Sequence, residues 1–223
     1  MPKKTAEKNI EQNPGAVYPS FIIVGAARAG RTALTHSLMQ HPRVYMPARE
    51  LNFFPFYRQQ PDFKVDYNDM VTGLGDYLSY FSGIKRDLDK TILGEKSITY
   101  LYFPWVDEVI RNIKHLHPSP ENLKIIIMLR QPVERMFSQY QFNRRYHEPL
   151  GFKGAIAAWE RRKREKWVPA YDYAGGSRYN YAVNAYLREF RHVKTCLYED
   201  FLNDPRQFVP ELFEFVGAGK FDF

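Results

Sequence analysis

The sequence predicts an α/β fold, a three-layer sandwich in which helices cover both faces of a central parallel sheet. Apolar segments of strand length alternate along the chain with segments of helical periodicity. The run from Lys124 to Arg130 is apolar almost throughout, as expected for a strand covered on both faces. Another strand, Phe21 to Val24, leads through a turn bracketed by Gly25 and Gly30 into a helix. This βα alternation indicates parallel strands joined by helices.

Local signals define the elements of the N-terminal half. The helix after the first strand covers Thr32 to Gln40 and ends before Pro42, because the residue preceding a proline is pushed out of helical geometry. Residues 55–75 are rich in Pro, Gln, Asp, Asn and Gly and predict a long loop, and loops of this size usually carry function. The other predicted elements are a short strand over Val44–Met46, a short amphipathic helix over Tyr77–Phe81, a strand over Thr91–Glu95 and a helix over Val106–Leu116.

The C-terminal half continues the alternation. Pro132 begins a helix that extends to Tyr146, since proline is favoured in the first turn of a helix. Residues 153–166 predict a helix with a very basic end, Arg161 to Lys166. We interpret that end as a solvated helix face rather than a site for an anionic polysaccharide or nucleic acid. The remaining elements are a helix over Tyr179–Phe190, a strand over Thr195–Tyr198 and a helix over Arg206–Val216.

Length and composition indicate one soluble domain. The 223 residues can bury a core without disulfides or metals, and the single cysteine, Cys196, excludes a disulfide framework. Residues 1–16 are polar and predict a loosely ordered lead-in, followed by one domain over 17–223. No segment has the apolar length of a signal peptide or a membrane span, so we expect a cytoplasmic protein. The net charge of +7 suits an anionic ligand without requiring one.

The turn after the first strand has the spacing of a phosphate-binding loop. Gly25, four further residues, Gly30, Arg31 and Thr32 match a Walker A loop, except that Arg31 stands where a nucleoside triphosphatase carries lysine. The backbone N–H groups of such a loop and the positive end of the following helix can hold a phosphate, and the Thr32 hydroxyl adds a donor. The predicted fold class is therefore P-loop nucleoside-triphosphatase-like, with an ordinary tight strand-to-helix turn as the alternative.

Polar residues gather after three of the predicted strands. They lie in the loop 25–32, in the sequence 94–97 and in the sequence 130–138. Because ligands of an open parallel sheet bind at the carboxyl ends of its strands, we expect these clusters to converge. Each cluster follows an apolar strand, so we expect its charged side chains to stay out of the core.

Arg130 and Ser138 form a second candidate anion site. Arg130 leaves the end of its strand and Ser138 lies on the helix begun by Pro132, so both can reach one phosphate. A magnesium-dependent ATPase or GTPase needs an acidic residue at the end of a neighbouring strand, where this chain has Arg130. We therefore expect a nucleotide with an additional phosphate and no metal. A surface ion pair between Arg130 and Glu134 is the alternative.

Four motifs at compatible spacing resemble the sulfotransferases that use 3′-phosphoadenylyl sulfate (PAPS), especially the branch that includes the heparan sulfate sulfotransferases and many soluble bacterial enzymes. Weaker similarity at 198–205 and 213–217 extends the resemblance over residues 20–217. The four motifs are Ile22–Leu34, His41–Phe54, Gly94–Tyr100 and Leu129–Tyr140.

The resemblance implies transfer of a sulfonate group from PAPS to an acceptor hydroxyl or amine, which releases adenosine 3′,5′-bisphosphate (PAP) without a metal. It implies that Glu50 is the catalytic base and that Arg28 and Lys96 are catalytic cations. The first motif is expected to bind the 5′-phosphosulfate and the last motif the 3′-phosphate. The cofactor-binding residues implied in this way are Ala27, Arg28, Ala29, Gly30, Arg31, Thr32, Ala33, Arg130, Ser138 and Tyr179.

The chain departs from the family pattern in two places. The family's loop usually has lysine at the position of Arg28 and a hydroxyl residue at the position of Arg31, and arginine is a planar fork rather than a compact ammonium. Family members also usually continue beyond the position of Phe223 into a basic, glycine-containing segment. We expect either a domain shortened at its C-terminus or a more open pocket.

Several alternatives are open at this point. A P-loop nucleotide kinase and a non-catalytic PAP- or PAPS-binding relative compete with the enzyme. Glu50 can be a surface carboxylate paired with Arg49, and Lys96 a solvated lysine. Phe53, Phe54, Phe56 and Tyr57 are expected in the core rather than in the acceptor cleft. The acceptor can be a carbohydrate, a lipid or a small natural product, no nucleic acid partner is expected, and the oligomeric state is not indicated.

Overall fold

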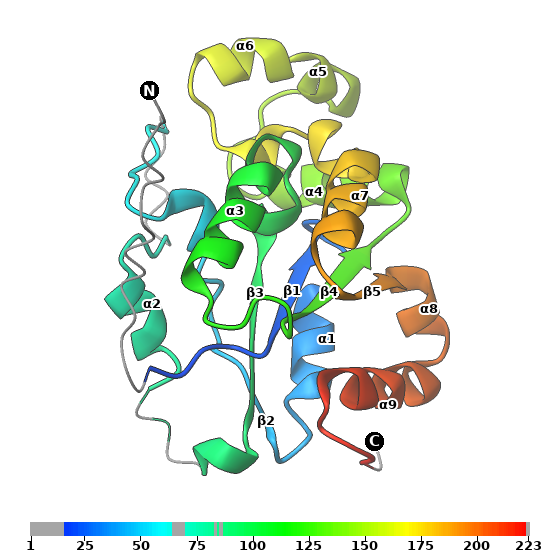
Figure 1. The fold of residues 1–223 in the computed structure, drawn as a ribbon. Helices are drawn as coiled ribbons and strands as arrows, with labels where there is room; N and C mark the ends of the chain where they lie inside the picture. The colour runs from blue at the N-terminus through cyan, green and yellow to red at the C-terminus, as the bar shows by residue number, and fades with distance from the viewer. Residues whose placement is uncertain (1–15, 64–69, 83, 85–86, 222–223) are drawn as a thin grey trace, which may run out of the picture.

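A computed structural model describes residues 16–63, 70–82, 84 and 87–221 and confirms the predicted fold class. Its centre is a five-stranded sheet of order β2-β3-β1-β4-β5 in which every neighbouring pair is parallel (Figure 1). The strands are β1 (Phe21–Gly25), β2 (Val44–Tyr45), β3 (Ile92–Ser97), β4 (Lys124–Leu129) and β5 (His192–Leu197).

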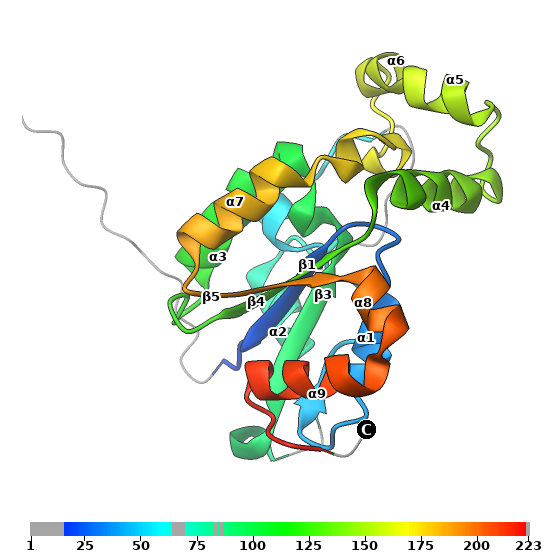
Figure 2. The same ribbon diagram turned by 90° about the vertical axis from the view of Figure 1, so that its right-hand side faces the viewer.

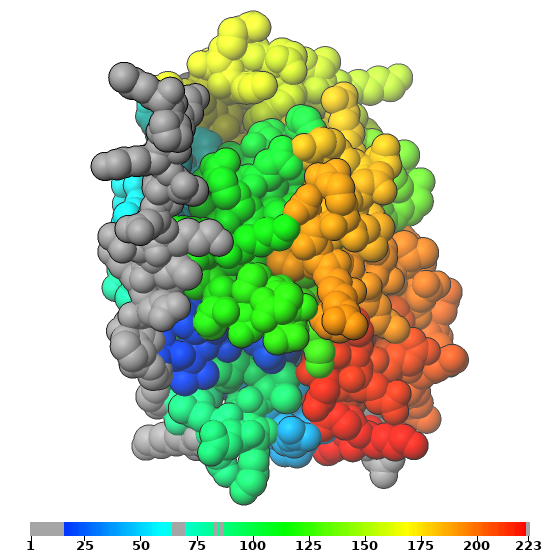
Figure 3. Space-filling model, viewed as in Figure 1, coloured from blue at the N-terminus to red at the C-terminus, as the bar shows by residue number. Residues whose placement is uncertain are grey.

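Helices cover both faces of the sheet, which explains why β1 and most of β4 are buried. Seen from the side, α3 (Val106–Leu116) and α7 (Tyr179–Glu189) lie on one face (Figure 2). On the other face lie α1 (Arg31–Leu38), α8 (Tyr198–Asn203) and α9 (Pro205–Val216). Figure 3 shows α3 and α7 packed next to each other over their face.

Three further helices lie beyond the carboxyl ends of the strands. They are α4 (Pro132–Arg144), α5 (Phe152–Ala157) and α6 (Trp159–Arg164), and they form the upper part of the molecule in Figure 1. The short helix α2 (Leu74–Ser79) lies beside the β2 side of the sheet (Figure 1). Single 3₁₀ turns connect the elements at Phe54–Phe56, Leu88–Lys90, Ile98–Leu101, Phe103–Trp105, Pro169–Tyr171 and Gly175–Ser177.

Local sequence explains where the helices near the site begin. Pro132 is the first residue of α4, and the side chain of Gln131 accepts a hydrogen bond from the N–H of Glu134. Gly30 precedes α1 with φ of 81°, and a Cβ there would lie 2.4 Å from the Tyr198 ring. Both the backbone angle and the close approach require glycine.

Most predicted elements are confirmed, and α3 has the predicted bounds. The helix predicted over 153–166 is instead two short helices, which meet at Ala158. The prediction of a wholly solvated basic face is wrong for Arg162, which is buried because it pairs with Glu148. The helix α8 was not predicted.

Other predictions fall partly outside the described residues. Of the lead-in over 1–16, only residue 16 is described, and residues 64–69 of the predicted loop over 55–75 are not. The end of that loop already forms the start of α2. Phe53, Phe54 and Phe56 are buried, as expected for the core. No helix in the described part of the chain is long and apolar enough to cross a membrane.

Candidate active site

The loop after β1 is compact and turns sharply into α1. The N–H of Ala26 donates to the Met128 carbonyl at 3.0 Å, so the loop continues to pack against β4 beyond the end of β1. Arg28 and Gly30 both have left-handed backbone angles, with φ of 65° and 81°. A Cβ on Gly25 would lie 2.8 Å from the Met128 carbonyl oxygen. The loop therefore has the tight backbone that phosphate binding by main-chain N–H groups requires.

The Arg28 side chain lies along α4. Its Nε donates to Ser138 Oγ at 3.3 Å, and its guanidinium lies 4.8 Å from the centre of the Phe142 ring. Burial lowers the pKa of Arg28, and the positive charges of Arg130, Arg145 and Arg31 lower it further. The first loop and the second candidate anion site therefore form one continuous cationic surface.

Arg130 connects several parts of this surface. It donates to the Arg28 carbonyl at 3.3 Å and pairs with Glu134 at 3.1 Å, so the ion pair considered as an alternative is present. Glu134 is largely exposed, and such pairs contribute little to stability. The guanidinium lies 4.8 Å from the centre of the Tyr198 ring, and the Tyr179 hydroxyl donates to the Arg130 carbonyl at 3.0 Å. Although it pairs with Glu134, Arg130 also contacts Arg28, which in turn contacts Ser138.

Glu50 pairs with Arg31, which the sequence did not indicate. Arg31 Nη2 lies 2.9 Å from Glu50 Oε1, and the Ile98 N–H donates to Glu50 Oε2 at 2.9 Å. The Arg31 side chain is only 7% exposed, and its Nε and Nη1 have no hydrogen-bond partner. Glu50 is 25% exposed and is therefore accessible to a ligand. The expected alternative, a surface carboxylate paired with Arg49, differs from this geometry.

Hydrogen bonds fix the segment that carries Glu50 onto the turn after β3. The N–H of Asn52 donates to Ser97 Oγ at 2.9 Å, and the N–H of Phe53 donates to the Tyr100 hydroxyl at 3.1 Å. The Thr99 hydroxyl donates to Asn52 Oδ1 at 3.0 Å. Asn52 has φ of 48°, a conformation that asparagine tolerates better than most residues. These residues position Glu50, and none of them was predicted to do so.

Lys96 and Glu95 correct the expectation that the charged residues after β3 stay out of the core. Both belong to β3 itself, which continues to Ser97, and both are buried. Burial lowers the pKa of Lys96, which the carboxylate of Glu50 opposes and the charge of Arg31 reinforces. Successive side chains of a strand point to opposite faces, so Lys96 and Glu95 cannot both reach the site.

Glu95 lies in the core near Tyr77 and Tyr100. Burial raises its pKa to about 8. The hydroxyls of the two tyrosines lower the pKa of Glu95 and so oppose this rise. Neither carboxyl oxygen of Glu95, however, has a hydrogen bond of normal geometry. Burial therefore decides the direction of the pKa shift and favours the protonated form of Glu95.

The structure thus brings together the backbone of the loop 25–32, Arg130 and Ser138 on one side, and Glu50, the Arg31 side chain and Lys96 on the other. The first group offers backbone and guanidinium donors to phosphate oxygens. The second group places one carboxylate between two cations, which suits proton removal beside a developing negative charge.

Comparison with known proteins supports a family assignment. A model described as "Sulfotransferase family" matches residues 19–222. A solved sulfotransferase from Alicyclobacillus acidocaldarius superposes with a TM-score of 0.80 and 31% identity, over 93% of this chain and 83% of that chain. A sulfotransferase domain from the curacin biosynthetic pathway has a TM-score of 0.57 at 16% identity, over 93% and 76% of the two chains, and shares the fold.

Two curated proteins are similar over shorter stretches. The membrane-associated sulfotransferase kil1 of Dictyostelium discoideum is 27% identical over 56% of this chain and 23% of its own length. The bifunctional heparan sulfate N-deacetylase/N-sulfotransferase 3 of Mus musculus is 26% identical over 66% of this chain and 17% of its own length. The chain therefore spans less than a quarter of either relative.

Proposed function

The chain belongs to the sulfotransferase family, and from this we propose that it transfers a sulfonate group from PAPS to an acceptor hydroxyl or amine and releases PAP. The observation that supports this proposal best is the position of Glu50, within 2.9 Å of Arg31 and next to Lys96 at the edge of the phosphate-binding loop. A kinase can also use a carboxylate as the base that accepts a substrate proton, so the family membership together with this position favours a sulfotransferase.

The nucleotide-binding residues divide between two phosphate groups. We assign the backbone of Ala27 to Ala33 and the Thr32 hydroxyl to the 5′-phosphosulfate. Arg130 and Ser138 are assigned to the 3′-phosphate, and Tyr179 holds the main chain of Arg130 through its hydroxyl. Arg28 already contacts Ser138, so it lies between the two phosphate positions.

PAPS supplies an activated sulfonate on a good leaving group. In the proposed step Glu50 removes the acceptor proton while the acceptor oxygen or nitrogen bonds to sulfur. The sulfur–oxygen bond to the 5′-phosphate breaks, and its electron pair leaves with PAP. Lys96, Arg28 and the loop N–H groups stabilise the negative charge that develops on this oxygen.

The contacts of Glu50 with Arg31 and with the Ile98 N–H compete with the approach of the acceptor proton. Its Oε1 faces Arg31 and its Oε2 accepts from the Ile98 N–H, so both oxygens are engaged. Two nitrogens of the buried Arg31 side chain, Nε and Nη1, have no partner. We propose that Arg31 turns toward the anionic cosubstrate when PAPS binds, which frees Glu50 Oε1 for the acceptor.

Calorimetry with PAP and with ATP tests the assignment. We expect PAP to bind more tightly than ATP, with an affinity that a chelator does not change. The alternative of a kinase predicts ATP preference and magnesium dependence. A non-catalytic relative would bind PAP but consume no PAPS with a broad acceptor panel, and a complete lack of PAP binding would refute the proposed function.

A further inference from the structure

A distant segment holds the connection between β4 and α4 that carries Arg130. The Tyr179 hydroxyl donates to the Arg130 carbonyl, and the Ser177 hydroxyl donates to the Pro132 carbonyl at 3.1 Å. Ser177 ends a 3₁₀ turn and Tyr179 begins α7. Hydrogen bonds from the segment 172–179, whose partners lie 45 and 49 residues away in the sequence, therefore fix this connection at two points.

The segment 172–179 is itself folded around a buried arginine. Arg135 lies near the start of α4 and is only 1% exposed. Its Nε donates to Ser177 Oγ, and its Nη2 donates to the Tyr173 carbonyl. The main chain of Gly176 packs on the guanidinium, because a Cβ there would lie 3.2 Å from Arg135 Nη2. The guanidinium therefore joins α4 to the segment that holds Arg130.

The charge of Arg135 is buried against neutral acceptors, a hydroxyl and a main-chain carbonyl. Burial lowers the pKa of Arg135, which Tyr179 and Asp172 oppose. The two oxygens of Asp172 are already bonded, one to the Tyr102 hydroxyl and the other to the Gly175 N–H, both at 2.8 Å. Burying a charge on such terms is costly. An arginine at this position is therefore explained by the hydrogen bonds that it makes, which an apolar side chain cannot replace.

The guanidinium also decides in which direction the Ser177 hydroxyl donates. Arginine has only donors, so Ser177 Oγ must accept from Arg135 and keeps its single hydrogen for another acceptor. The Pro132 carbonyl at 3.1 Å is closer than the Tyr173 carbonyl at 3.4 Å. The series of hydrogen bonds thus runs from Arg135 through Ser177 to Pro132, two residues after Arg130. Without the guanidinium, the Ser177 hydroxyl loses the contact that orients it.

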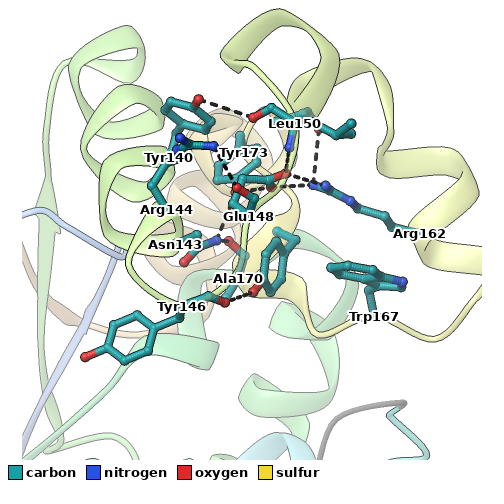
Figure 4. Close-up of polar contacts among 12 residues, drawn as sticks. Tyr140, Asn143, Arg144, Tyr146, Glu148, Leu150, Arg162, Trp167, Ala170 and Tyr173 are labelled. Carbon is teal, nitrogen blue, oxygen red and sulfur yellow. Dashed lines mark hydrogen bonds and ion pairs between the residues drawn. The ribbon is translucent and has the colours of Figure 1, made fainter.

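A buried ion pair fixes the other end of Tyr173 (Figure 4). The Tyr173 hydroxyl donates to Glu148 Oε2 at 2.7 Å and accepts from Asn143 Nδ2 at 3.0 Å. Glu148 and Arg162 form two hydrogen bonds of 2.7 and 2.8 Å, and both residues are almost fully buried. Burial favours the neutral form of Glu148, but the hydrogen bonds from Arg162 and Tyr173 outweigh it and lower the pKa. Tyr173 therefore offers Arg135 a fixed acceptor.

We infer that Arg135 is a positioning residue for the 3′-phosphate site and that it holds, through Ser177, the connection from which Arg130 reaches the nucleotide. The inference rests on the proposed function, since it adds a residue to the same nucleotide site. The loop assigned to the 5′-phosphosulfate is held separately, because the Ala26 N–H donates to the Met128 carbonyl of β4. Loss of Arg135 should therefore weaken the contacts of the 3′-phosphate and spare those of the 5′-phosphate.

Calorimetry with PAP and with ADP, which lacks the 3′-phosphate, tests the inference on Arg135→Met, Ser177→Ala and the double variant. We expect each single variant to weaken PAP by about tenfold, as for the loss of one hydrogen bond, and to change ADP by less than about twofold. The double variant should lose no more than Arg135→Met alone, because both changes break the same series of contacts. Arg188→Met removes an equal charge from an exposed position of α7 and should change neither affinity.

Unchanged PAP affinity in Ser177→Ala, or equal losses for the two nucleotides, would overturn the inference. Losses that multiply in the double variant would also overturn it, because Arg135 would then act by its charge or by touching the nucleotide. Unchanged ADP affinity shows that a variant is folded. Ser177→Ala is a small change at a half-buried residue and decides the test by itself if Arg135→Met does not fold. A natural protein that binds no PAP would instead refute the proposed function.

Discussion

Glu95→Gln should gain stability relative to the natural protein as the pH rises, because glutamine does not have to hold a proton in the core. Glu95 is 1% exposed and burial raises its pKa from 4.5 to about 8, so the folded protein holds a proton that the unfolded chain releases. The natural protein is therefore favoured below pH 4.5 and loses stability up to pH 8. The slope is about 1.4 kcal/mol per pH unit, which gives about 5 kcal/mol over the whole interval as an upper limit.

The assay is urea unfolding of both proteins at several pH values between 4.5 and 8.5. Glutamine does not titrate, so the difference in the free energy of unfolding should grow in favour of Glu95→Gln and become constant above pH 8. Glu121→Gln makes the same chemical change at an exposed carboxylate and should show little of this trend. A difference that does not change between pH 5 and 8 would refute the assignment of a buried, protonated Glu95.

Three further predictions concern the site and the buried pair of Arg162 and Glu148. Glu50→Gln should lower kcat by about 100-fold or more while PAP affinity stays within about twofold, measured by PAP release and calorimetry; a near-natural rate would place the base elsewhere. Arg130→Ala should weaken PAP by about 10- to 100-fold but leave ADP, which lacks the 3′-phosphate, unaffected; equal losses for both nucleotides would contradict its assignment to the 3′-phosphate. Arg162→Met should cost about 3–5 kcal/mol in urea unfolding, because it leaves the buried Glu148 without its partner. Adding Glu148→Leu should recover part of that loss, and no recovery would show that packing, not charge, decides stability there.

The fold was largely predictable because it depends on the pattern of apolar residues. The run in β4 and the helical spacing in α3 identify buried elements from local sequence alone. β3 shows the limit of this approach, since Glu95 and Lys96 look like the solvated end of a strand. Only the surrounding residues decide that both are buried, and these are distant in the sequence. The helix α8 was missed because its first turn, Tyr198 to Asp200, continues directly from β5.

The candidate site was predictable as a set of residues but not as a set of contacts. The motif spacing indicated Glu50 and Arg31, yet their ion pair joins two segments that only the folded sheet brings together. The buried pair of Glu148 and Arg162 was even less accessible, because Arg162 stands in a basic run that resembles a solvated helix face.

The two arginines by which the loop departs from the family pattern, Arg28 and Arg31, have different structural roles. Arg28 lies outside the loop against α4, where it keeps a positive charge near Ser138. Arg31 instead runs beneath the loop, and its Cδ lies 3.1 Å from where a Cβ on Gly25 would be. A hydroxyl residue at position 31 is too short to span that path to Glu50. An arginine there therefore depends on glycine at position 25, and through the proposed movement of Arg31 it would link the pairing of Glu50 to occupancy of the loop.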